Sequence, residues 1–214
     1  RGSWRCFISR TEAALFVLLL IPSALVAWAN LDMPQFGAVH DDSIYYVSAK
    51  AWASGQGHRI ISLPGEPWQT KYTPLYPLLL SLVWRVAPEF PSNLRVATVF
   101  AWMLLPPLLW LIRVLYRRYG FPAWGAWLMI AILAINPYVQ LFSRSMFSEI
   151  LFTVLVLAVL LLAPRWAAAA GAVAGLAYLT RTAGLPLLVA VPSVYVIRRE
   201  WRRAAAFSAT MMLF

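Results

Sequence analysis

The chain alternates between apolar segments and short polar connections over its whole length. A membrane-crossing helix needs about 20 mostly apolar residues, and the longer segments approach that length. We therefore expect an all-α, polytopic helical membrane protein with about six to seven transmembrane helices. The expected spans are residues 13–29, 94–116, 123–142, 147–163, 167–180, 185–197 and 204–214.

Two stretches depart from this pattern. Residues 75–86 are apolar but short and flanked by prolines, so we predict an interfacial helix there rather than a span. Residues 30–73 form the longest polar stretch, which we expect to be a first external loop that also carries interfacial helices. A connection of this length between two spans is typical of a functional loop.

The composition agrees with membrane embedding. Hydrophobic residues make up 62% of the chain and charged residues 12%, and the mean hydropathy is +0.70. The net charge of +10 comes from arginines scattered between apolar segments rather than gathered in a stripe. We therefore expect membrane lipids, and not nucleic acid, as partners.

The distribution of basic residues predicts the orientation. If the N-terminus is cytoplasmic, eleven of the 18 Lys and Arg residues lie inside and seven outside. The loop 30–73 is then on the outer face. The excess of Arg over Lys suggests a bacterial genome, so we expect the bacterial cytoplasmic (inner) membrane.

An alternative interpretation of the first apolar segment is a cleaved signal peptide. Basic residues precede the segment, and the sequence Ala27-Trp28-Ala29 resembles a cleavage site. The loop 30–73 lies outside in either case. An uncleaved span agrees better with the polytopic pattern of the rest of the chain.

The acidic pair Asp41-Asp42, followed by Tyr45, is the most distinctive feature of the external loop. Two adjacent carboxylates beside a span are costly to desolvate unless they meet a partner, so they indicate a functional site. The alternative is structural, because acidic residues in the first turn of a helix interact favourably with its dipole.

Four short motifs together resemble the GT-C superfamily of membrane glycosyltransferases. Within it the chain is most similar to the protein O-mannosyltransferase, aminoarabinose transferase and rhizobial lipopolysaccharide glycosyltransferase group. The family usually has Asp-Glu where this chain has Asp-Asp. The motifs are Asp41-Asp42-x-x-Tyr45, Lys71-x-x-Pro-Leu-Tyr-Pro, Arg144-Ser-Met-Phe-Ser-Glu149 and Leu179-Thr180-Arg181.

The resemblance implies that residues 1–214 are the N-terminal part of a GT-C type transmembrane domain, truncated at its C-terminus. Such enzymes transfer a sugar from a polyprenyl-phosphate-linked donor to a lipid, glycan or protein acceptor on the outer face, usually with inversion. We expect the same activity here. The alternatives are a membrane transporter and a non-catalytic subunit of envelope assembly.

The expected carboxylate roles follow from inverting transfer, in which a base removes the proton of the acceptor hydroxyl. By its position Asp41 is the expected base, and Asp42 is expected to orient the site, bind the acceptor or help to hold a cation. Glu149 is expected to bind substrate on the acceptor side. If the enzyme uses a divalent cation, these three carboxylates are the candidate ligands, since such ions prefer oxygen; the cofactor stays unassigned.

The remaining expected site residues bind substrate. Lys71, Arg181 and His58 would stabilise the charge of the leaving phosphate, and Tyr45 would contact substrate. The structural alternatives are interfacial anchoring for Lys71 and Arg181, a solvated loop position for His58, and an ion pair with Arg144 for Glu149.

Glycines predict how the fifth apolar segment packs. Gly171 and Gly175 have the GxxxG spacing that lets two helices approach closely. We expect this segment to pack tightly against its neighbours.

Overall fold

The computed structural model describes residues 9–214, and these fold into helices without any β-strand. The all-α prediction is therefore confirmed for the described part of the chain. Arg1 and Arg5, which contribute to the predicted charge balance, lie outside the described residues. The elements are α1 (Arg10–Ala29), α2 (His40–Ala53), α3 (Leu75–Val86), α4 (Leu94–Trp102), α5 (Leu105–Arg118), α6 (Ala123–Ile135), α7 (Pro137–Ser143), α8 (Glu149–Leu162), α9 (Ala167–Thr180), η1 (Thr182–Gly184), α10 (Leu187–Ile197) and α11 (Trp201–Met211).

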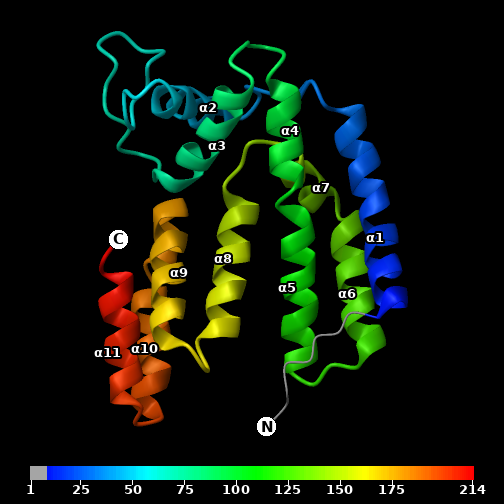
Figure 1. The fold of residues 1–214 in the computed structure, drawn as a ribbon, viewed down its shortest axis with the longest axis vertical. Helices are drawn as coiled ribbons and strands as arrows, with labels where there is room; N and C mark the ends of the chain where they lie inside the picture. The colour runs from blue at the N-terminus through cyan, green and yellow to red at the C-terminus, as the bar shows by residue number, and fades with distance from the viewer. Residues whose placement is uncertain (1–8) are drawn as a thin grey trace.

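The helices form a bundle with a layer across one end (Figure 1). Helices α1, α5, α6, α8, α9, α10 and α11 run along the bundle and alternate in direction. Helices α2 and α3 lie across its upper end, and α4 stands above α5. The helix α3 covers the range predicted for the interfacial helix, and α2 begins at the histidine that precedes the acidic pair.

Two helical stretches are long and apolar enough to cross a membrane: Arg10–Ala29 and Leu94–Arg118, the latter formed by α4 and α5. A third exists if α6 and α7, which meet at a bend of 66°, count as one span. The other apolar helices have 10–17 residues, fewer than the ~20 of a full crossing. By length and composition the structure thus supports two to three spans, and not the predicted six to seven.

The break between α6 and α7 has a local cause. Pro137 has no backbone N–H and cannot continue the hydrogen-bond ladder of α6. The Asn136 side chain accepts hydrogen bonds from the N–H groups of Tyr138 and Val139, which starts a new helix. The apolar pattern of residues 123–142 is continuous, so periodicity alone does not reveal this bend.

The upper layer is held by a buried aromatic cluster between α2 and α3. The rings of Tyr46 and Trp84 lie 4.7 Å apart, and the Trp84 indole donates a hydrogen bond to the Tyr46 carbonyl (3.1 Å). Met146 and Leu151 belong to the same cluster, which therefore joins the layer to the segment around α8. This packing fixes the first turn of α2, which carries the acidic pair.

A buried ion pair ties three helices together. Arg113 of α5 pairs with Glu12 of α1, and its guanidinium lies over the rings of Trp110 and Trp127. The Arg113 side chain is only 8% exposed, so the carboxylate and the two rings compensate much of its desolvation.

The predicted close packing of α9 is confirmed. A Cβ atom added at Gly171 would overlap the Phe207 carbonyl oxygen and the Thr210 hydroxyl of α11, and one at Gly175 would overlap the Phe214 ring. Both glycines therefore let α9 and the C-terminal segment approach more closely than larger residues allow.

We predict that Gly171→Ala destabilises the chain by about 1–3 kcal/mol, since the added methyl meets backbone that cannot move aside. Gly125→Ala in α6 is the matched control, because its Cβ would meet only Pro122 at 3.4 Å. The control is expected to keep or raise the unfolding temperature in detergent. Equal stability of the two variants would contradict the packing role of Gly171.

Candidate functional site

The first turn of α2 separates the two carboxylates of the acidic pair. Asp42 is buried, and both of its oxygens accept the Gly37 N–H (3.1 and 3.2 Å). The Ser43 N–H also donates to Asp42, at 2.6 Å. Burial raises the pKa of the Asp42 carboxyl, and these N–H donors offset part of that rise. In this geometry Asp42 fixes the turn that leads into α2.

Asp41 has a different environment. It is half-buried, and its Oδ1 accepts a short hydrogen bond from the hydroxyl of Tyr72. Desolvation raises the pKa of Tyr72, and the hydrogen bond to Asp41 raises it further, so the phenol keeps its proton and donates. Tyr72 thereby orients one oxygen of Asp41, and no group among residues 9–214 donates a hydrogen bond to the other.

His58 positions the backbone of this loop. Its Nε2 lies 2.9 Å from the Tyr72 carbonyl oxygen, and the Trp52 indole donates to its Nδ1 (3.3 Å). Because Nδ1 accepts, the proton of the neutral ring resides on Nε2, which donates to Tyr72. Gln69 Oε1 accepts from the N–H of Lys71 at 2.9 Å and shapes the same turn.

A polar network connects α2 to the start of α8 and to the end of α9. The Tyr45 hydroxyl lies 3.0 Å from the hydroxyl of Ser148, the buried residue that precedes α8. Arg181, which ends α9, donates to the same Ser148 hydroxyl (3.1 Å) and pairs with Glu149 at 2.6 Å. Glu149 therefore pairs with Arg181, and not with Arg144.

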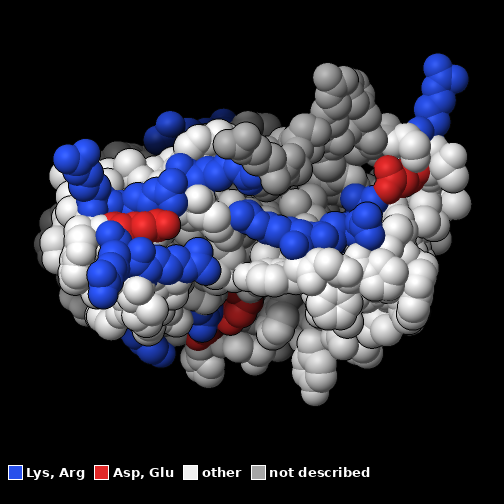
Figure 2. Space-filling model, turned by 90° about the horizontal axis from the view of Figure 1, so that it is seen from below, with Lys and Arg blue, Asp and Glu red and all other residues white. Residues whose placement is uncertain are grey.

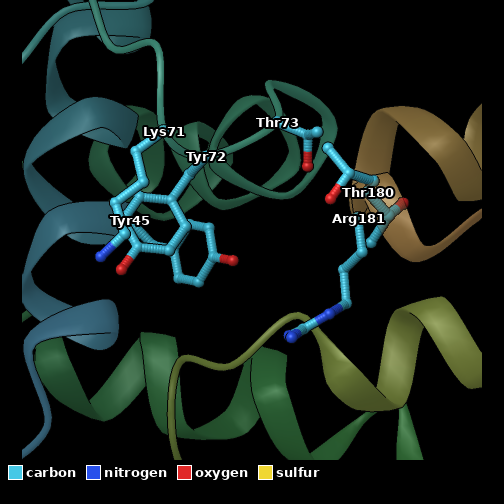
Figure 3. A pocket seen from close by; sticks show the side chains of 7 residues that line it. Tyr45, Lys71, Tyr72, Thr73, Thr180 and Arg181 are labelled. Carbon is cyan, nitrogen blue, oxygen red and sulfur yellow. The ribbon is translucent and has the colours of Figure 1, made fainter.

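These residues surround a polar cavity of about 150 Å³ between the upper layer and the bundle. Figure 3 shows Lys71 and Tyr72 on one side of it and Arg181 on the other. The cavity therefore has a cation on each of two sides and hydroxyl groups between them. It is lined by Tyr45, Lys71, Tyr72, Thr73, Thr180, Arg181 and Thr182.

The cavity is positively charged. The Lys71 ammonium lies 4.9 Å from the centre of the Tyr72 ring, and the interaction with Tyr72 raises the pKa of Lys71, so the ammonium stays charged at neutral pH. Burial raises the pKa of Tyr45. The charge of Arg181 lowers this pKa, and the charges of Glu149 and Asp41 raise it. An anion of phosphate size fits this environment.

A second cavity, of about 250 Å³, is almost entirely apolar and begins at Glu149. Glu149 lines this cavity, and its Oε1 pairs with Arg181, which lines the polar one. Its buried Oε2 has no hydrogen-bond partner among residues 9–214. The apolar walls come from α5, α6, α7 and α8. The lining residues are Leu108, Ile112, Leu133, Val139, Phe142, Glu149, Ile150 and Thr153.

The predicted site residues thus fall into two groups. Tyr45, Lys71 and Arg181 line one cavity, with Asp41 attached through Tyr72 and Glu149 through Arg181. Asp42 and His58 hold the surrounding backbone instead.

Within residues 9–214 no group of three or more His, Cys, Asp or Glu side chains is arranged to hold a metal ion.

Several site residues were not predicted. Tyr72, Ser148 and Thr180 all lie inside the quoted motifs, yet hydroxyl-bearing residues there carry no pattern that separates them from neighbouring positions. The roles of Tyr72 and Ser148 depend on contacts across 31 and 103 residues of chain, Asp41–Tyr72 and Tyr45–Ser148. Only the tertiary structure brings these partners together.

No protein-family model matches this chain, and neither curated proteins nor solved structures give a match. The resemblance to membrane glycosyltransferases therefore depends on the four short motifs alone.

We predict that Asp42→Asn is at least as stable as the unchanged chain at pH 7, since the amide oxygen still accepts the Gly37 N–H without a buried charge. Asp42→Ala removes that acceptor and is expected to cost about 1–2 kcal/mol. Thermal unfolding in detergent measures both, and equal destabilisation by Asn and Ala would contradict this.

The pH dependence follows from the raised pKa of Asp42. The folded chain holds this proton more tightly than the unfolded chain, so the contribution is complete below the ordinary pKa of 3.8 and is lost as pH rises through the folded-state pKa. Any stability advantage of Asp42→Asn should therefore shrink as pH falls towards 3.8.

Proposed function

We propose that this chain is a membrane glycosyltransferase of the GT-C type. It transfers a sugar from a polyprenyl-phosphate-linked donor to a lipid, glycan or protein acceptor, with inversion. The observation that carries the proposal is the polar cavity between Lys71 and Arg181, with Asp41 oriented at its edge by Tyr72. The reaction needs a base for the acceptor hydroxyl and positive charge for the leaving phosphate. Asp41 can supply the base, and Lys71 and Arg181 can supply the positive charge.

Asp41 acts as the general base in this proposal. It takes the proton of the acceptor hydroxyl while the acceptor oxygen forms a bond to the anomeric carbon. The bond from that carbon to the phosphate oxygen breaks, and the polyprenyl phosphate leaves with the electron pair. Tyr72 is a positioning residue, because its hydroxyl engages one carboxylate oxygen and leaves the other for the acceptor.

The leaving phosphate is stabilised by the two cations of the cavity. Arg181 is the stronger candidate, since it lines the cavity and a guanidinium can bind a phosphate through two parallel N–H bonds. Lys71 lies on the opposite side (Figure 3). The apolar cavity suits the first isoprene units of the donor, because it is lined by Glu149, the ion-pair partner of Arg181.

We propose that the chain lies in the bacterial cytoplasmic membrane with α2 and α3 on the outer face. In this proposal α1 and α4–α5, the two stretches long and apolar enough to span, cross the membrane, and the bent pair α6–α7 adds a third crossing. Basic residues at the opposite end support a cytoplasmic N-terminus. A transporter and a non-catalytic assembly subunit remain the alternatives, and both predict no sugar transfer.

The base assignment predicts that Asp41→Asn lowers transfer by at least about 100-fold, the usual contribution of a general base. Asp42→Asn is the matched control and should keep most of the activity. The assay measures incorporation of labelled sugar from polyprenyl-phosphate donors into membranes that contain the chain. Full transfer by Asp41→Asn would overturn the mechanism.

The phosphate role of Arg181 can be separated from its structural role. Arg181→Gln leaves Glu149 unpaired and is expected to destabilise the chain by about 1 kcal/mol, since the pair is only half-buried. Adding Glu149→Gln should restore the unfolding temperature but not the affinity for the donor. A double variant with restored donor affinity would show that Arg181 serves only the ion pair.

A further inference from the structure

A second basic site lies at the opposite end of the bundle, in the turn between α10 and α11. Four of the six residues from 198 to 203 are arginines. The turn lines an open surface depression of about 550 Å³. Figure 2 shows basic side chains over much of this end of the molecule. The depression is lined by Arg199, Glu200, Trp201, Arg202 and Arg203.

Three of these arginines are available to a ligand. Arg203 is already engaged, since it pairs with Glu200 at 2.9 Å and donates to the Pro164 carbonyl. Arg198, Arg199 and Arg202 are exposed, and among residues 9–214 their side chains have no hydrogen-bond or ion-pair partner. Cations concentrated without internal partners point to an anion outside the chain.

Arg199 has a backbone conformation that favours glycine. Its φ angle is +60°, in the left-handed region, directly after α10. The N–H groups of Arg199 and Glu200 donate to the Val196 and Tyr195 carbonyls, which closes the helix end. Glycine adopts this conformation at lower cost. The turn therefore does not require an arginine side chain at this position.

Trp201 adds an interfacial residue to the same turn. It is the first residue of α11, and 62% of its surface is exposed. Tryptophan is enriched where the apolar core of a membrane meets the headgroups. The turn lies at the end of the bundle opposite α2 and α3 (Figure 1), so it would sit at the headgroup level of one leaflet.

We propose that the α10–α11 turn binds the phosphate of an anionic phospholipid headgroup. The three available arginines hold the phosphate, and Trp201 rests among the headgroups beside it. This lipid site lies at the other end of the bundle from the sugar-transfer cavity and does not depend on that activity. A headgroup with two phosphates matches the charge best, because one turn carries three arginines without a partner among residues 9–214 and its glutamate already pairs with Arg203.

The test measures lipid binding to the full chain in detergent by native mass spectrometry. The probes are diphosphatidylglycerol, phosphatidylglycerol and phosphatidylcholine. We expect diphosphatidylglycerol to bind most tightly and phosphatidylcholine weakly. Arg199→Gly and Arg202→Gln should each weaken binding of the anionic lipids about five-fold, and about 25-fold together. Arg85→Gln is the matched control, an exposed arginine without a recorded partner in α3.

Arg199→Gly keeps the experiment independent of folding, because glycine suits the turn and should not lower the unfolding temperature. Unchanged lipid affinity in the Arg199→Gly, Arg202→Gln double variant would overturn the proposal, as would an equal loss in Arg85→Gln. Displacement of the lipid by a small excess of inorganic phosphate would also overturn it, since the ligand would then be a soluble anion.

Discussion

The hydroxyl of Ser148 joins the two layers of the molecule, and the candidate site exists because of it. Tyr45 reaches this buried hydroxyl from α2, and Arg181 reaches it from the end of α9. A buried hydroxyl must find partners, so each of these contacts also satisfies the serine. The same junction places Arg181 beside Glu149 and opposite Lys71. A polar cavity therefore forms where an apolar bundle meets a polar layer.

The proposed chemistry at this junction depends on the protonation states of Tyr72 and Lys71, which their surroundings determine. Tyr72 keeps its proton and therefore donates to Asp41, while Lys71 keeps its charge. Asp42 and His58 support the two chain segments that carry these residues. Neighbouring residues in the sequence thus have separate tasks, since Asp41 faces the site and Asp42 holds its backbone.

The sequence predicted much of the fold because apolar length and glycine spacing are local signals. The helix at 75–86 and the close packing at Gly171 appear where they were expected. The predicted count of six to seven spans exceeds the two to three that length and composition support. Asn136 and Pro137 divide one apolar segment, and several helices are short. The motifs predicted five residues that line the cavity or contact its lining: Tyr45, Lys71, Arg181, Asp41 and Glu149. Tyr72 and Ser148 were missed because only long-range folding gives them their partners.

The central claim is that the polar cavity beside Arg181 and the apolar cavity lined by its partner Glu149 together hold a lipid-linked phosphate. Photo-crosslinking tests this most directly, with a polyprenyl phosphate that carries a photoreactive group on its first isoprene unit. The account predicts adducts on α5, α6, α7 or α8 around Ile112 and Ile150, and their loss when unlabelled polyprenyl phosphate competes. Adducts confined to other helices, or labelling that competitor does not reduce, would contradict it.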